Sequence, residues 1–250
     1  GPNGDSPIIA LSPSTVSEAF WVTVKAVDIS ERFRTPVIIL SEGLLALLWE
    51  VIDLPDYSEV QVGDRPRPTG PPEDYKTYAL TSPEDIPPMG DFGSGYRSIF
   101  HYVPNHPYGA RNGQEALDFT LNHLHAKIMA HREEITITKA TQTEDAEILL
   151  IAAGTQARSA ETAVGQARDK GLKVGLLKLT TLWPFPYDRV QDAAKSARLV
   201  VVPEMNSGQI QGEVMKALRR HPAEIVGVNH LNSLPITPDE ILDAINKEMS

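Results

Sequence analysis

The chain has 250 residues and a mass of 27.4 kDa, and its 33 acidic against 23 basic side chains give a net charge of −10. This acidity argues against a nucleic acid or an anionic membrane surface as the main partner. The sequence contains no cysteine, so this chain makes no disulfide and ligates no iron–sulfur cluster through thiolates. It also lacks a run of about 18 apolar residues, which a membrane-spanning helix needs. We therefore expect a cytoplasmic globular protein that binds neither nucleic acid nor membrane.

The first fifty residues predict a β-α-β-α segment. Apolar runs bounded by proline at 8–11 and 36–40 predict buried strands. Between them, a capping box at 15–18 begins a helix with two apolar stripes, one of Val16, Phe20, Val24 and Val27 and the other of Val22, Ala26, Ile29 and Phe33. A second helix is predicted over 44–51. Two parallel strands do not make a stable sheet alone, so we interpret residues 1–52 as the C-terminal part of a domain whose earlier strands are absent or come from another chain.

Residues 53–135 have a different character. Eight prolines between positions 55 and 88 predict extended, loop-rich structure. The glycine-rich run at 90–95 lacks the preceding strand and the following Lys-Ser/Thr of a phosphate-binding loop, so a flexible connector is the preferred interpretation. Leucine and isoleucine at helical spacing predict one long helix over 114–134. We assign 53–135 to a proline-rich connector and a linking helix.

Residues 136–250 predict a complete domain. Apolar runs at 148–153, 174–177, 199–202 and 224–228 predict buried strands, and each is followed by an amphipathic helix. The last helix begins at 237–240, with proline at its first position and acidic residues in its first turn. Four β-α units in about a hundred residues predict the α/β class, with a doubly wound parallel sheet.

The candidate functional residues follow the predicted third strand, because ligands of such sheets bind at the carboxyl ends of the strands. The sequence there is Glu204-Met205-Asn206-Ser207-Gly208-Gln209, and we take Glu204, Asn206, Gly208 and Gln209 as strand-end or subunit-interface candidates. The alternative is helix capping, in which Asn206 or Ser207 accepts from helix amides and Gly208 permits close approach. Gly154-Thr155 also opens a helix, but a tight turn is preferred because the G-x-G-x-x-G pattern is missing.

Two other patterns favour structure over chemistry. The segment 182–186 places two aromatic residues between prolines, which is typical of a rigid hydrophobic corner. The seven histidines show no H-E-x-x-H spacing, and no G-x-S-x-G elbow is present, so we predict no metal site and no Ser-His-Asp triad. The residue patterns by themselves do not predict a reaction.

Five segments in the same order along the chain resemble the alpha subunit of 2-oxoacid:ferredoxin oxidoreductases, the family of pyruvate and 2-oxoglutarate ferredoxin oxidoreductases. The first is the N-terminal segment, in which the similar stretches are 1–7, 11–18 and 34–41. The other four are the helix end 130–135, the run 179–186 that is similar to Leu-Lys-Thr-Leu-Trp-Pro-Phe-Pro, the run 204–209 that is similar to Glu-Met-Asn-x-Gly-Gln, and the run 235–241. Each segment alone is weak evidence for the resemblance, and the occurrence of all five in the same order makes the match specific.

The resemblance implies a subunit, or the C-terminal part of one, that serves in the oxidative decarboxylation of a 2-oxoacid with coenzyme A to acyl-CoA and CO2. It implies a transketolase-like fold, in which the tail of a pyrimidine-type thiamine-diphosphate-binding domain precedes a transketolase C-terminal-like domain. Thiamine diphosphate and Mg²⁺ would be shared with a beta subunit. Iron–sulfur clusters would lie only in partner chains, either beta or ferredoxin-like gamma/delta subunits, which pass electrons to ferredoxin.

The resemblance also carries expectations about the site. Asn3, Gly4 and Asp5 would lie nearest the shared active site and contact the cofactor. The activating glutamate and the substrate loop are expected before Gly1, so no catalytic residue is assigned. Where the family has Thr-Gly-Leu-x-His-Asp-Glu, this chain is divergent at His101–Tyr108, which leaves the identity of the 2-oxoacid open.

Two alternatives remain. The chain is a non-catalytic assembly or docking module of such a complex, or it is a transketolase-type or branched-chain dehydrogenase-type subunit, which passes acyl groups to sugar or lipoyl acceptors. The Glu-Met-Asn-x-Gly-Gln resemblance argues against the second alternative.

Overall fold

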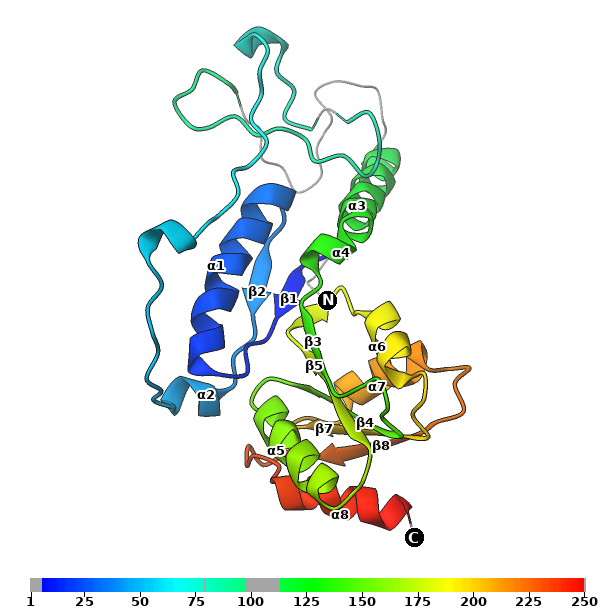
Figure 1. The fold of residues 1–250 in the computed structure, drawn as a ribbon. Helices are drawn as coiled ribbons and strands as arrows, with labels where there is room; N and C mark the ends of the chain where they lie inside the picture. Colours follow the sequence, from blue (N-terminus) through cyan, green and yellow to red (C-terminus); the bar gives the residue numbers. More distant parts are fainter. Residues whose placement is uncertain (1–5, 79, 98–112, 250) are drawn as a thin grey trace. The chain divides into compact units, whose positions relative to one another are not determined.

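The structure is a computed structural model that describes residues 6–78, 80–97 and 113–249 (Figure 1). The chain forms two compact units. Unit 1 comprises 1–9, 24–38 and 55–135, and unit 2 comprises 10–23, 39–54 and 136–250. Both units therefore combine segments that are distant in the sequence. The assignment of domains to 1–52, 53–135 and 136–250 stays a prediction.

Unit 2 contains a five-stranded sheet in the order β3-β5-β4-β7-β8 (Figure 1). Its strands are β3 (Thr138–Thr141), β4 (Ile148–Ala153), β5 (Val174–Leu179), β7 (Leu199–Glu204) and β8 (Glu224–Asn229). The last four pair in parallel, as the sequence predicts. The strand β3 pairs with β5 in the antiparallel direction and was not predicted, because its short, half-exposed sequence gives no buried apolar run.

Helices cover both faces of this sheet. They are α5 (Gln156–Asp169), α6 (Tyr187–Ala194), α7 (Gln209–Ala217) and α8 (Pro238–Glu248). Alternate residues of β4 point to opposite faces: Ile148, Leu150 and Ala152 join the core under α5 and α8, and Leu149, Ile151 and Ala153 join the core under α6 and α7. The predicted α/β class and the doubly wound parallel sheet are thus confirmed.

Helix α8 begins with the predicted proline and acidic residues, and its first turn also contains a capping box that was not predicted. The Thr237 side chain accepts from the Glu240 N–H at 3.3 Å, and the Glu240 carboxylate accepts from the Thr237 N–H at 2.8 Å. This reciprocal pair satisfies two amides that the first turn of a helix leaves without partners.

A second, three-stranded sheet has the order β2-β1-β6, with β1 at Ile9–Leu11, β2 at Val37–Ile39 and β6 at Thr181–Trp183. In unit 2, β1 pairs with β6 in the antiparallel direction, and the Leu11 carbonyl accepts from the Leu40 N–H at 2.7 Å. The segment predicted as a hydrophobic corner therefore begins with a strand. Its Phe185 packs into the core under α6 and α7, so the packing interpretation is confirmed.

Three helix predictions need correction. Helix α1 (Val16–Phe33) buries the stripe of Val22, Ala26, Ile29 and Phe33, but Val27 of the other stripe is exposed, so only one stripe is fully buried. Helix α2 (Gly43–Leu47) ends before the predicted position 51, where the chain becomes extended. The long helix over 114–134 is instead two, α3 (Gly113–Ala130) and α4 (Arg132–Ile135), which are interrupted at His131.

Unit 1 contains a buried cation that lacks a carboxylate partner among the described residues. The Lys127 side chain on α3 is 2% exposed, and its Nζ donates to the Arg34 carbonyl at 3.1 Å. The Arg34 guanidinium is itself occupied by the carbonyls of Thr77, Pro87 and Pro88. Burial first, and the charge of Arg34 second, lower the pKa of Lys127 from 10.5 to about 8.

A polar network joins the start of α1 to β5 within unit 2. The Glu18 carboxylate accepts from the Ser14 N–H at 2.8 Å, from the Thr180 hydroxyl at 2.9 Å and from Lys178 Nζ at 3.1 Å. The predicted capping box is thus half correct: the Thr15 hydroxyl accepts from the Glu18 N–H at 3.0 Å, but the Glu18 carboxylate turns to Ser14 because Lys178 and Thr180 hold it there.

Glu18→Gln is expected to destabilise unit 2 at neutral pH by about 2 kcal/mol, because the neutral amide loses the charge of Lys178 and the charge-assisted bonds. Burial opposes ionisation of Glu18, but the Ser14 and Thr180 bonds and Lys178 outweigh it, so its pKa lies below the ordinary 4.5. The stabilisation is present above pH 4.5 and is lost as the pH falls through the folded-state pKa. Urea unfolding at pH 7 and at lower pH measures this. A difference in unfolding free energy between the variant and wild type that stays constant with pH would contradict this role of the Glu18 charge.

Across the described residues, helices of the length and apolar character needed to cross a membrane are absent.

Candidate functional site

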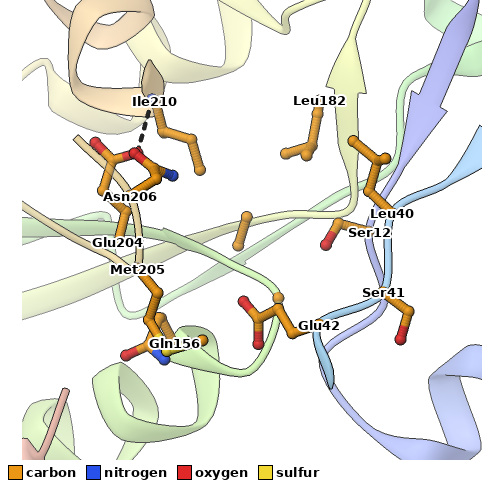
Figure 2. A pocket seen from close by; sticks show the side chains of 12 residues that line it. Ser12, Leu40, Ser41, Glu42, Gln156, Leu182, Glu204, Met205, Asn206 and Ile210 are labelled. Atoms are coloured by element: carbon orange, nitrogen blue, oxygen red, sulfur yellow. Dashed lines mark hydrogen bonds between the residues drawn. The ribbon is translucent and has the colours of Figure 1, made fainter. Parts of the chain in front are cut away.

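Unit 2 contains a cavity of about 220 Å³ at the carboxyl ends of β4 and β7. In the sheet, β5 is the neighbour of β4 on one edge, and β7, which comes later in the chain, is its neighbour on the other edge. The crevice between the carboxyl ends of β4 and β7 is therefore the topological switch point of the sheet, where ligands of open α/β sheets usually bind. Ser12 and the segment 40–42 lie on one side of the cavity, and Glu204 and Asn206 lie on the other (Figure 2); Gly154 also lines it.

Glu204 ends β7 and caps α7. Its side chain is 2% exposed, and its carboxylate accepts from the backbone N–H groups of Ile210 at 2.8 Å and Gln211 at 2.9 Å (Figure 2). The first amides of a helix lack intrahelical partners and carry partial positive charge, so a buried carboxylate is stabilised there. Glu204 thus lines the cavity, but both of its oxygens are engaged in holding α7.

The other predicted residues of this segment form the turn before α7. Asn206 Oδ1 accepts from the N–H groups of Gly208 at 2.9 Å and Gln209 at 3.0 Å, and Asn229 donates to the Asn206 carbonyl at 3.1 Å. Gly208 has φ +101°, a conformation that favours glycine. The capping interpretation is confirmed for Asn206. Asn206 lines the cavity with Glu204, whereas Gly208 and Gln209 are not part of its lining.

Glu42 was not predicted, and it is the counterpart of Glu204 on the facing wall (Figure 2). It lies three residues after the end of β2, and its carboxylate accepts from the Thr155 N–H at 3.0 Å and from the Thr155 hydroxyl. Thr155 precedes α5, so Glu42 occupies the N-terminus of that helix as Glu204 occupies that of α7. The one signal in the sequence was a charged residue next to a strand end, which does not reveal a partner 113 positions away.

Gly154 permits the close approach of Glu42. It has φ +58°, and a Cβ atom at this position would collide with the Glu42 carboxyl group and lie 3.4 Å from the Ser12 hydroxyl. The predicted tight turn at Gly154-Thr155 is therefore present, and it serves to seat a carboxylate from another segment.

Gly154→Ala is expected to destabilise unit 2 by about 2 kcal/mol or more, because both the backbone strain and the displaced Glu42 oppose folding. Gly171→Ala is the matched control: Gly171 has φ +83°, but nothing lies within 4 Å of its added Cβ, so only the strain of about 1 kcal/mol remains. Thermal or urea unfolding of both variants measures the difference. Equal losses would show that the Glu42 contact does not contribute.

The two capped helices determine which ligands the cavity accepts. Helix N-termini elsewhere bind phosphate. Here the Ile210 and Gln211 amides of α7 already donate to Glu204, and the amide of Thr155, the residue just before α5, donates to Glu42. A diphosphate group would meet two carboxylates in place of free amides. The lining residues of this cavity therefore do not fit the diphosphate of thiamine diphosphate. Among the described residues, no group of three or more histidine or acidic side chains is placed to hold a metal ion.

The remaining predicted site residues lie outside the described part of the chain. These are Asn3, Gly4 and Asp5, together with the divergent segment 101–108. Their assignment to the neighbourhood of a shared active site stays a prediction. Gln156, which sequence reasoning missed, lies beside the cavity and accepts from the Ile236 N–H at 3.1 Å.

Comparisons with known proteins relate both parts of the chain to one group of enzymes. Residues 3–107 match the family model described as pyruvate flavodoxin/ferredoxin oxidoreductase, thiamine diphosphate-binding. Residues 146–241 match the model described as pyruvate:ferredoxin oxidoreductase core domain II.

Similar proteins cover nearly the whole chain. The 2-oxoglutarate synthase subunit KorA of Methanothermobacter marburgensis is 36% identical over 98% of this chain and 65% of the relative. The ketoisovalerate oxidoreductase subunit VorB of the same organism is 30% identical over 90% of this chain and 56% of the relative. The structure of 2-oxoglutarate:ferredoxin oxidoreductase from Magnetococcus marinus, solved with 2-oxoglutarate, coenzyme A and succinyl-CoA bound, matches 100% of this chain and 44% of its own with a TM-score of 0.85 and 25% identity.

The chain thus spans about 65% of the length of the first of these curated relatives. The matches extend over both units, and they agree with the parallel α/β sheet. The chain belongs to the family of 2-oxoacid:ferredoxin oxidoreductase alpha subunits.

Proposed function

We propose that this chain serves, as an alpha subunit or part of one, in a thiamine-diphosphate-dependent 2-oxoacid:ferredoxin oxidoreductase. The overall reaction converts a 2-oxoacid, coenzyme A and two oxidised ferredoxins to acyl-CoA, CO2, two reduced ferredoxins and a proton. The observation that carries the proposal is the 36% identity to a 2-oxoglutarate synthase subunit across nearly the whole chain.

The subunit is proposed to act only in a complex. In the cavity at the carboxyl ends of β4 and β7, the amides of Thr155 and Ile210 already donate to Glu42 and Glu204 and are not available to a diphosphate. The chain also has no cysteine to ligate an iron–sulfur cluster. We therefore assign the diphosphate, Mg²⁺ and the clusters to partner chains, a beta subunit and ferredoxin-like gamma/delta subunits. The cytoplasm is the proposed compartment, since ferredoxin and coenzyme A are cytoplasmic reactants.

The first substrate to test is 2-oxoglutarate, because a relative and the Magnetococcus marinus enzyme carry that name. The 2-ketoisovalerate name of the VorB relative makes the branched 2-oxoacid the second candidate. Pyruvate belongs in the same panel, since both family models are named for it.

The test is reconstitution. This chain, the beta subunit and any cluster-bearing subunit are purified together, supplied with thiamine diphosphate and Mg²⁺, and assayed for 2-oxoacid- and coenzyme A-dependent reduction of ferredoxin. We expect turnover that needs every subunit and is absent when coenzyme A is omitted. Turnover that persists unchanged without this chain would make it a docking module. Acyl transfer to a lipoyl acceptor without ferredoxin reduction would favour the dehydrogenase-type alternative.

A further inference from the structure

Four strongly exposed apolar side chains of unit 2 lie on residues 47–54, the last residue of α2 and the extended chain that follows it, which we call the strap. Trp49 is 97% exposed, Val51 is fully exposed, and Leu47 and Leu54 are exposed by 78% and 74%. Single exposed apolar residues are ordinary, but four large ones within eight residues are characteristic of an interaction surface. Tryptophan in particular is enriched among the residues that dominate binding energy at interfaces.

The strap is held in a definite conformation by its inward-facing side. In an extended chain alternate side chains point in opposite directions. Glu50 accepts from the Val16 N–H at 2.9 Å and pairs with Arg158, and Ile52 is half-buried. Their neighbours Trp49 and Val51 consequently point outward. Trp49 and Val51 are therefore exposed because the contacts of Glu50 and Ile52 fix the direction of their side chains, and not because the segment is a free loop.

The backbone of the strap is also without partners among the described residues, since the amide and carbonyl groups of 49–54 make no hydrogen bond to other backbone groups. An extended, apolar segment with unpaired backbone groups promotes association unless something covers it. The strap thus combines an apolar face with free backbone donors and acceptors.

Charge indicates what kind of surface covers it. The strap contains no basic side chain and two acidic ones, Glu50, which pairs with Arg158, and Asp53. Asp53, within the strap, is exposed and has no ion pair or hydrogen bond among the described residues. A second copy of this chain, with its net charge of −10, would bring like charges together. A basic surface would instead be attracted.

We propose that the strap docks a partner subunit of the oxidoreductase, through an apolar pocket that receives Trp49 and a lysine or arginine that faces Asp53. This inference rests on the proposed function, because it takes the occupant to be another subunit of that enzyme. The apolar contact supplies most of the affinity, and the charge pair accelerates association.

The test compares two pairs of variants for binding to the purified beta subunit. Trp49→Ala is expected to weaken the equilibrium affinity at least about 30-fold, as for other tryptophan anchors. Leu231→Ala, at a residue of unit 2 that is 77% exposed outside the strap, is expected to change it less than twofold. Asp53→Lys is expected to slow association about tenfold and to reduce its salt dependence, whereas Asp243→Lys on the exposed side of α8 is not.

Oxidative footprinting provides the second measurement. Trp49 is expected to react rapidly with hydroxyl radicals in the isolated chain and at least tenfold more slowly in the assembled complex. A Trp49 that is protected in the isolated chain at all concentrations, or that becomes protected by self-association, would overturn the proposal. So would equal affinity of Trp49→Ala and wild type. Binding is measured without turnover, so an assembled complex that reduces no ferredoxin would count against the proposed function and leave the docking result readable.

Discussion

Glu204→Ala is expected to destabilise unit 2 by about 3 kcal/mol, the largest loss among the substitutions considered. The buried carboxylate accepts from two backbone amides at the start of α7, at 2.8 and 2.9 Å. Alanine removes both charge-assisted bonds and leaves two amides in an enclosed place, where each unsatisfied donor costs about 1–3 kcal/mol. Urea unfolding followed by circular dichroism measures the loss, and hydrogen exchange of the Ile210 and Gln211 amides locates it.

The controls separate the cap from a general effect of removing a carboxylate. Glu161→Ala, at an exposed position of α5, is expected to change stability by less than about 0.5 kcal/mol. Glu204→Gln keeps the shape but replaces one acceptor with a donor, so an intermediate loss is expected. A Glu204→Ala variant as stable as wild type, with unchanged amide exchange, would show that Glu204 does not hold α7.

Lys127→Met is expected to stabilise unit 1 by about 2 kcal/mol at pH 7, which is unusual for a buried substitution. The lowering of the Lys127 pKa from 10.5 to about 8 corresponds to a folding penalty of about 3 kcal/mol. Methionine has a similar volume and removes that penalty, while the bond to the Arg34 carbonyl, worth about 1 kcal/mol, is lost.

The pH dependence identifies the cause of that gain. Above pH 10.5 lysine is neutral in both states, so the penalty is absent; it develops as the pH falls from 10.5 to about 8 and is constant below that. The gain from Lys127→Met is therefore expected to be full at pH 7 and to shrink as the pH is raised. Calorimetry at several pH values measures it, with Lys170→Met, at an exposed lysine, as the control. A loss of stability at pH 7 would mean that the folded state needs the charge, for example to hold an anion.

The elements that the sequence predicts well are those whose signal is local. The unbroken apolar run of β4 reflects burial on both faces, and Thr237-Pro238-Asp239-Glu240 contains both halves of its own capping box. The correct reading of Asn206 as a cap has the same origin, since its partners Gly208 and Gln209 are two and three residues away.

The predictions that failed depend on partners far along the chain. Strand β3 exists because β5 offers an edge to it, and α2 ends early because Glu50 is drawn to Val16 and Arg158. The stripe of α1 that contains Val27 is as apolar as the other one, but Val27 is exposed. Helical periodicity shows which residues can share a face, and only the neighbouring elements decide whether that face is covered.

The sequence by itself determined the α/β class, the parallel direction of four strands, the start of α8, the cap at Asn206 and the resemblance to a family, because each depends on residues that are neighbours in the chain. The tertiary structure alone decided the character of the switch-point cavity. Glu42 and Thr155 are 113 positions apart, and no local sequence pattern predicts that the Glu42 carboxylate occupies the amide of Thr155 at the start of α5. The same holds for the strap: the sequence predicted a helix over 44–51, whereas the structure ends α2 at Leu47 and exposes Trp49 and Val51. Long-range contacts are chosen by the packing of the whole chain, and they determine which groups a site has left to offer.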